Sequence, residues 1–362
     1  MLLAVEYTGR CRIWIVKLSV HLAARVRFVL TKSSRDSTLH QNANNVAQGA
    51  GRHCPTLYGV AASRLPRKEI EMLKGSFVAL VTPFKNGDVD YTALETLLQY
   101  HLDNGTHGIL LLGTTAETAG LASDEKNALL RFAMHKINGR VPVMIGTGTN
   151  NLQQSLANTQ KAKEMGADYA LVITPYYIKP TQNGMYEYFS AIAAKVDIPI
   201  VIYNVPGRTG VNIAASTVVR LAKDHPNIVG VKEASGNIVQ ATEIVRDAPE
   251  SFVLMSGEDA LNLPLMAIGA KGTVSVTANV VPRLMSEHME TCMAGDMATA
   301  ASQHQYLQKM NNVMFIETNP IPAKEALHMM GMIGLEFRSP MCPLTDASRA
   351  TLKAILQEYK LI

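Results

Sequence analysis

The chain alternates short apolar runs with longer segments of helical periodicity from Gly75 onward. The runs begin about 20 to 35 residues apart, which is the spacing of repeated βα units. Runs that are apolar throughout are typical of parallel strands covered on both faces, because a strand with one wet face alternates apolar and polar positions. The pattern predicts eight strands, at residues 77–81, 109–112, 143–145, 170–173, 200–203, 229–231, 253–255 and 273–276.

Helical periodicity fills the segments between these runs and after the last one. It predicts helices that include 91–104, 124–137, 152–165, 185–196 and 216–223, and later 282–293, 297–314, 320–330 and 345–357. Thr345 with Ser348 three residues on is a typical N-cap. The α/β pattern favours a (β/α)8 TIM barrel (75–295) with a C-terminal helical appendage (296–362), although a doubly wound sheet also fits it.

Positive charge is concentrated in a basic N-terminal tail, residues 1–70. Residues 1–68 carry eleven Lys or Arg and two acidic residues, a net charge of +9, while the remainder carries 23 basic and 28 acidic residues, a net of −5. No basic stripe with interleaved aromatic residues follows residue 70, so we expect no nucleic-acid partner. Lys17, Arg25 and Arg27 interrupt the apolar stretch 13–30, which makes a membrane-spanning helix too costly.

The tail itself has two interpretations. Its Arg-rich, acid-poor composition resembles an organellar transit peptide. The polar, patternless segment 42–51 fits a disordered tail or a gene start placed too far upstream. The four cysteines show neither CxxC nor metal-binding spacing, so reduced thiols in the cytoplasm are the default expectation. We expect a cytoplasmic protein, or an organellar one if the tail is a transit peptide.

Polar residues follow the predicted strands at their carboxyl ends, where βα barrels hold their catalytic groups. Lys232 follows the apolar run 228–231, so its side chain should extend from a buried strand into the barrel mouth. Burial disfavours the ammonium form and frees the amine to attack a carbonyl. The alternative is a lysine at the rim that extends into water.

Other strand ends carry hydroxyl groups and a guanidinium. Tyr203, on the preceding strand, could shuttle protons during imine formation or simply fill the barrel top with its ring. Thr114 and Thr115 could bind a carboxylate at the start of a helix or serve as turn and cap residues. Arg208 lies in a Pro-Gly-Arg-Thr-Gly loop, where its guanidinium suits a second carboxylate, although loop arginines are often only solvated.

Metal and nucleotide chemistry are not indicated by the motifs. None of the seven histidines in residues 75–362 falls at the carboxyl end of a predicted strand, and no pair is spaced as ligands on one helix. No glycine-rich phosphate fingerprint follows a strand. We therefore expect an enzyme that uses neither a metal nor a cofactor.

Four motifs at the strand ends carry a family resemblance. They are Gly113-Thr114-Thr115-Ala116-Glu117, Thr174-Pro175-Tyr176-Tyr177, Tyr203-Asn204-Val205-Pro206-Gly207-Arg208-Thr209-Gly210 and Val231-Lys232-Glu233-Ala234. From about Gly75 to Ile362 the chain resembles the 4-hydroxy-tetrahydrodipicolinate synthase (dihydrodipicolinate synthase) family, lyases related to N-acetylneuraminate lyase and other class I aldolases. The arginine of the third motif points to the synthase within that wider group. Residues 1–70 have no counterpart.

The resemblance implies covalent chemistry with pyruvate. Lys232 would form the Schiff base and Tyr203 would donate and accept protons. Thr114 would link Tyr203 to Tyr177 in a proton relay, with Tyr177 crossing a subunit interface. Family members are commonly homotetramers built as dimers of dimers.

The resemblance also implies how both substrates are held. Thr115 would bind the pyruvate carboxylate, and the backbone of Val274 would close the pyruvate pocket. Arg208 would bind the carboxylate of L-aspartate 4-semialdehyde, and Gly257 would let the substrate approach the backbone. The product would be the cyclised (2S,4S)-4-hydroxy-tetrahydrodipicolinate, on the route to diaminopimelate and lysine.

Two departures from the family pattern bear on affinity and regulation. Ala116 stands where the family usually has Gly, which would cost about 1 kcal/mol if that position needs a positive φ. Positions that in feedback-regulated members hold L-lysine look like Ser123, Lys126 and Gln154 here. Gln154 lacks a negative charge and Lys126 adds a positive one, so we expect weak or absent inhibition by L-lysine.

Two other functions remain compatible with the sequence. A sister aldolase acting on sialic acid or a 2-keto-3-deoxy sugar acid would keep Lys232 and Tyr203 but has no evident need for Arg208. A barrel that binds pyruvate-like ligands without turnover, as a sensor or scaffold, would not need the full set of Lys232, Tyr203, Thr114 and Tyr177.

Overall fold

The computed structural model describes residues 2–5, 13–16 and 73–362. It divides into two compact units, Met1–Pro66 and Arg67–Ile362. In the first unit, β1 (Leu2–Val5) pairs antiparallel with β2 (Ile13–Val16). The rest of the predicted tail, residues 1–70, lies outside the described residues, so the interpretations of that tail stay predictions.

A closed parallel barrel forms the centre of the second unit. In the described part of the chain it has eight strands, in the order β3-β6-β7-β8-β9-β10-β11-β12 and back to β3. This closure confirms the barrel and excludes the doubly wound sheet. All eight predicted strands are present, as β3 (Gly75–Ala79), β6 (Gly108–Leu111), β7 (Val143–Gly146), β8 (Tyr169–Ile173), β9 (Ile200–Asn204), β10 (Ile228–Glu233), β11 (Val253–Ser256) and β12 (Gly272–Ser275).

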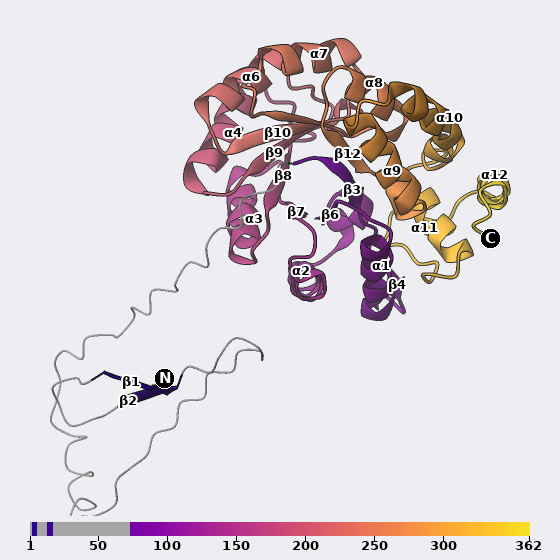
Figure 1. Ribbon diagram of the computed structural model, residues 1–362, viewed down its shortest axis with the longest axis horizontal. Coiled ribbons are helices and arrows are strands. Elements are labelled where there is room, and N and C mark those ends of the chain that lie inside the picture. The colour runs from indigo at the N-terminus through magenta and orange to yellow at the C-terminus, as the bar shows by residue number, and fades with distance from the viewer. Residues whose placement is uncertain (1, 6–12, 17–72) are drawn as a thin grey trace, which may run out of the picture. The chain divides into compact units, whose positions relative to one another are not determined.

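Helices surround the strands on the outside of the barrel (Figure 1). Asp90, Asn151, Thr181 and Asn237 cap four of them, each accepting from a backbone N–H of the first turn. The helices are α1 (Tyr91–Asp103), α2 (Ser123–Ile137), α3 (Leu152–Glu164), α4 (Gln182–Lys195), α5 (Pro206–Thr209), α6 (Ala215–Asp224), α7 (Ile238–Asp247), α8 (Asn262–Ala267) and α9 (Pro282–Met293), with short 3-10 turns η1 (Thr114–Ala116), η2 (Thr118–Gly120), η3 (Asp259–Leu261) and η4 (Thr277–Asn279). A small hairpin, β4 (Phe84–Lys85) and β5 (Asp88–Val89), follows β3.

Two apolar layers explain why the strands are apolar throughout. On β3, Phe77 and Ala79 join the cluster that fills the barrel interior, while Val78 packs in the layer between strands and helices. On β6, Leu110 likewise lies in the barrel interior and Ile109 lies between strands and helices. Because both faces of each strand are covered, polar side chains are confined to the strand ends.

The C-terminal helices pack onto the barrel and share its core. They are α10 (Met297–Val313), α11 (Ile321–Met329) and α12 (Asp346–Glu358), seen in orange and yellow in Figure 1. Leu307, Leu327 and Leu352 belong to the same buried cluster as Leu94 and Leu129 of the barrel's helices. The predicted cap of α12 is confirmed, because the Thr345 side chain accepts from the Ser348 N–H at 3.3 Å.

Candidate active site

Lys232 and Tyr203 lie side by side in the barrel mouth. They occupy paired positions near the carboxyl ends of the neighbouring strands β10 and β9. The Lys232 Nζ lies 4.2 Å from the centroid of the Tyr203 ring, and both residues are buried, at 5% and 7% exposure. A buried amine beside a phenol is chemically suited to forming an imine. The alternative of a rim lysine extending into water is therefore wrong.

Gly257 provides the space beside Lys232. Its N–H donates to the Glu233 carbonyl at 2.8 Å, which holds the end of β11 against β10. A Cβ added at Gly257 would lie 3.0 Å from Lys232 Cγ and 2.8 Å from Ala234 Cβ. Any larger residue would therefore displace the lysine stem or the strand that carries it.

A buried hydrogen-bond network around Glu233 fixes the ends of β9 and β10. Its carboxylate accepts from Asn204 Nδ2 at 3.0 and 3.2 Å, from Gln240 Nε2 at 3.2 Å and from the Ser235 N–H at 2.7 Å. Because Asn204 follows Tyr203 and Glu233 follows Lys232, this network sets the relative position of the two candidate catalytic side chains. Asn204 belongs to the third motif, but no role was predicted for it or for Gln240, because an amide side chain carries no local sign of a buried partner.

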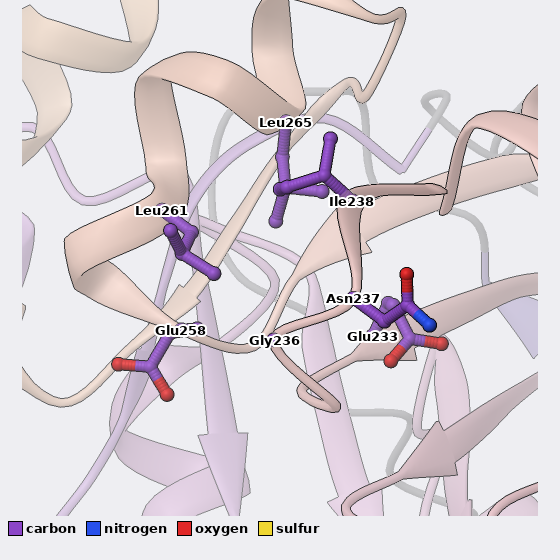
Figure 2. A pocket seen from close by; sticks show the side chains of 7 residues that line it. All are labelled: Glu233, Gly236, Asn237, Ile238, Glu258, Leu261 and Leu265. Atoms are coloured by element: carbon purple, nitrogen blue, oxygen red, sulfur yellow. The ribbon is translucent and has the colours of Figure 1, made fainter. Parts of the chain in front are cut away.

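A pocket opens next to this network at the carboxyl ends of β10 and β11 (Figure 2). Its lining residues are Glu233, Gly236, Asn237, Ile238, Glu258, Leu261 and Leu265. Figure 2 shows Glu233 and Glu258 on opposite sides of it, with the three apolar side chains between them and above. Burial, with the neighbouring Asp259 carboxylate, raises the pKa of Glu258 above its usual value, against the opposing charge of Lys232. The lining does not include Lys232 or Tyr203, so this pocket lies beside the candidate site.

The turn after β6 carries the predicted carboxylate-binding threonines. Thr114 and Thr115 form η1, and Thr115 is only 2% exposed. Thr115 Oγ1 accepts from Asn319 Nδ2 at 3.0 Å, and the Ala116 carbonyl accepts from Thr82 Oγ1 at 2.8 Å. Among the described non-glycine residues, positive φ occurs at the nearby Glu117 but not at Ala116. The alanine therefore does not meet the condition under which it would strain the turn.

A buried ion pair ties the same turn to the C-terminal helices. Lys324 Nζ on α11 lies 2.5 Å from Glu117 Oε1, and their side chains are 0% and 3% exposed. The other carboxylate oxygen of Glu117 accepts from the Arg338 N–H at 2.8 Å. Lys324 was not predicted from the sequence, because a lysine within a helix has no local feature that marks it as buried.

Val274 and Arg208 lie on two further elements of the mouth. Val274 is buried on β12, in the cluster that fills the barrel interior with Phe77. Arg208 lies on α5 with an exposed side chain, and its Nη2 donates to the Asn319 carbonyl at 3.3 Å. The structure thus places Arg208 near Thr115 through a shared neighbour, Asn319.

Tyr177 makes no hydrogen bond to the other predicted relay residues within the described part of one chain. Its side chain is 84% exposed, its φ is 72°, and its N–H donates to the Thr209 carbonyl at 3.2 Å. In the described residues no hydrogen bond joins Tyr177 to Thr114 or Tyr203. The predicted relay is therefore not assembled by a single chain, and the role of Tyr177 stays a prediction.

No group of three or more His, Cys, Asp or Glu side chains in residues 73–362 is arranged to hold a metal ion. In the same part of the chain, every helix is too short or too polar to cross a membrane.

Comparison with known proteins gives one consistent family. A model of the dihydrodipicolinate synthetase family matches residues 72–359. The 4-hydroxy-tetrahydrodipicolinate synthases of Hydrogenobaculum sp. and Aquifex aeolicus are 48% and 47% identical over 80% of this chain and 100% and 99% of their own length. The crystal structure of dihydrodipicolinate synthase from Aquifex aeolicus matches with a TM-score of 0.78 at 47% identity, covering 80% of this chain and 98% of that one. The resemblance drawn from the four motifs is confirmed, and the chain belongs to the dihydrodipicolinate synthetase family.

Proposed function

We propose that this protein is a lyase of the class I aldolase type, a 4-hydroxy-tetrahydrodipicolinate synthase that condenses pyruvate with L-aspartate 4-semialdehyde in diaminopimelate and lysine biosynthesis. The observation that carries the proposal is the buried Lys232 amine lying 4.2 Å from the Tyr203 ring in the barrel mouth. Relatives of 47–48% identity that bear this name support it over the sister aldolases. A related synthase from Acinetobacter baumannii, 40% identical, has been solved with pyruvate bound.

The reaction begins with attack of the Lys232 amine on the ketone carbon of pyruvate. Tyr203 protonates the carbinolamine oxygen, which leaves as water, and the imine forms. Tyr203, now deprotonated, accepts a methyl proton, and the enamine forms. The enamine carbon attacks the aldehyde carbon of the semialdehyde, which restores the imine, and Tyr203 returns the proton to the aldehyde oxygen to give the hydroxyl group. The semialdehyde amine finally adds to the imine carbon and displaces Lys232, which releases the cyclised product and restores the free lysine.

The substrate carboxylates are assigned to two separate groups. Thr115, with the backbone of Val274, holds pyruvate, and Gly257 leaves room for the adduct beside Lys232. Arg208, exposed on α5, receives the carboxylate of the semialdehyde, because a guanidinium can bind a carboxylate through two parallel hydrogen bonds. The sister aldolases have no evident need for a guanidinium at this position, which is why Arg208 favours the synthase.

Tyr177 is assigned to the active site of a neighbouring subunit. A tyrosine that is 84% exposed in its own chain is suited to contact a second copy. Thr114 would then link the incoming Tyr177 hydroxyl to Tyr203, as the family relay requires. The proposal therefore includes a homotetramer, built as a dimer of dimers, with the cytoplasm as its location.

Borohydride trapping tests the covalent step. With pyruvate and borohydride, mass spectrometry should find a reduced pyruvyl adduct on Lys232, and activity should be lost. Lys232→Ala should give no adduct. Lys271 is an exposed lysine just before β12, and the control variant Lys271→Ala should be trapped like the parent. Tyr203→Phe should fold normally and lose about 10²-fold or more of the rate.

A coupled assay with pyruvate and L-aspartate 4-semialdehyde, run beside a sialic-acid cleavage assay, tests the substrate. Turnover of the semialdehyde without sialic-acid cleavage is the expected result. Full activity in Lys232→Ala would overturn the Schiff-base mechanism, and cleavage of sialic acid alone would favour a sister aldolase.

A further inference from the structure

Asn319 contacts both groups to which the two substrate carboxylates are assigned. It lies between α10 and α11, 204 positions from Thr115 and 111 from Arg208 along the chain. Its side-chain Nδ2 donates to Thr115 Oγ1 at 3.0 Å, and its backbone carbonyl accepts from Arg208 Nη2 at 3.3 Å. The residue is 4% exposed, so these contacts are made largely out of water.

The direction of the Asn319–Thr115 hydrogen bond decides what Thr115 can offer a ligand. A threonine hydroxyl has one proton and two lone pairs. When Asn319 Nδ2 donates to a lone pair, the Thr115 proton is left to point elsewhere. A carboxylate accepts hydrogen bonds and cannot donate one, so it needs that proton.

We propose that Asn319 is a positioning residue that directs the Thr115 hydroxyl proton at the pyruvate carboxylate. The inference rests on the function proposed above and adds a determinant of pyruvate affinity contributed by the C-terminal helical region. The two contacts of Asn319 are made by different parts of the residue. The side chain of Asn319 serves Thr115, while its backbone carbonyl, which no substitution removes, serves Arg208.

The same segment holds the threonine turn at a second point. Five residues after Asn319, Lys324 makes the buried ion pair with Glu117, which lies two residues after Thr115. The segment 319–324 therefore contacts the turn on both sides of Ala116. These contacts hold the turn, and the Asn319 hydrogen bond to Thr115 Oγ1 restricts where the hydroxyl proton can point.

Asn319→Asp tests the proposal with almost no change of shape. An aspartate carboxylate can only accept, so it would draw the Thr115 proton toward itself and away from pyruvate. The pyruvate KM should rise about tenfold or more, as expected for losing a hydrogen bond to a charged group. The semialdehyde KM should change less than twofold, because the backbone carbonyl that contacts Arg208 remains.

Asn319→Ser and a double variant distinguish orientation from general damage. Asn319→Ser removes the amide donor without adding charge and should raise the pyruvate KM by a smaller factor. In a Thr115→Val background, where the hydroxyl is absent, Asn319→Asp should add no further increase in pyruvate KM. Equal increases in both substrates' KM, or additive effects in the double variant, would show a structural role instead.

Borohydride trapping at graded pyruvate concentrations supplies a readout that does not depend on the second substrate. The half-saturating pyruvate concentration should shift in Asn319→Asp by the same factor as the KM. An unchanged half-saturation would mean that Thr115 donates to Asn319, and the proposal would be overturned. If the parent protein itself is not trapped by pyruvate, the proposed function fails, and that outcome is distinct from failure of the Asn319 assignment.

Discussion

Replacing Lys324 by methionine removes one charge from the buried pair and nearly preserves the side chain's volume. The ammonium lies 2.5 Å from Glu117 Oε1 and also over the rings of Phe84 and Phe337, at 4.3 and 4.9 Å from their centroids. Burial lowers the pKa of Lys324 below its ordinary value, and the charge of Glu117 opposes that shift. The carboxylate of Glu117 therefore opposes the loss of charge that burial favours.

The expected loss of stability follows from the burial of both partners. With Lys324→Met, Glu117 would remain a buried carboxylate with the Arg338 N–H as a remaining donor. Removing one partner of a buried pair costs about 3–5 kcal/mol, because an uncompensated charge is left out of water. A pair in water contributes about 0.2–1 kcal/mol. The exposed pair of Lys309 and Glu358, at 2.6 Å with side chains 60% and 49% exposed, is the matched control.

Urea unfolding followed by circular dichroism at one fixed protein concentration measures the difference. The free energy of unfolding should fall by about 3–5 kcal/mol in Lys324→Met and by less than about 1 kcal/mol in Lys309→Met. The double variant Glu117→Gln with Lys324→Met should recover most of the loss, since it removes both charges. If Lys324→Met were no more destabilising than Lys309→Met, the reasoning from burial would be refuted.

Four further predictions concern substrate choice, packing, regulation and acid stability. Arg208→Ala should raise the semialdehyde KM and lower kcat, with a combined cost on the order of 2–4 kcal/mol and little change in pyruvate binding. If the variant and the parent had equal semialdehyde kinetics, the sister aldolases would again be candidates. Gly257→Ala should lower kcat/KM about tenfold or more with an unchanged circular dichroism spectrum, because the new Cβ would lie 3.0 Å from Cγ of Lys232. Parental kinetics would contradict this prediction. L-lysine should inhibit weakly or not at all, since Gln154 lacks a charge and Lys126 repels the ligand. Clear inhibition at sub-millimolar lysine in the steady-state assay would disprove this prediction. Burial lowers the pKa of His101 from 6.5 to about 3, so between these pH values the unfolded chain binds a proton that the folded chain does not. This group alone lowers the free energy of unfolding by roughly 1.4 kcal/mol for each pH unit below 6.5, and His288, whose pKa burial lowers to about 4, adds to the effect. His101→Asn should flatten this slope in urea unfolding from pH 7 to 4, and an unchanged slope would assign the acid sensitivity to other groups.

The barrel and its candidate chemistry could be predicted from local patterns. Both faces of each strand are covered, so each strand appears in the sequence as a short apolar run. The closed barrel then shows which strands are neighbours. Lys232 and Tyr203 could be paired in advance because the carboxyl ends of parallel strands meet at one mouth. The motifs at those ends were specific enough to identify the family.

The contacts that hold the site in place were decided by the tertiary structure. Asn319 and Lys324 reach the threonine turn from more than 200 positions away, and an asparagine in a loop or a lysine on a helix carries no local sign of its partner. Ala116 escapes the strain that a positive φ would impose on it, because the turn places its positive φ at Glu117 instead. Tyr177, predicted to join a relay across a subunit interface, has 84% of its surface exposed in its own chain. Periodicity reports which face of an element is buried, whereas the partner of a buried polar group depends on how distant elements pack, and only the folded chain determines that.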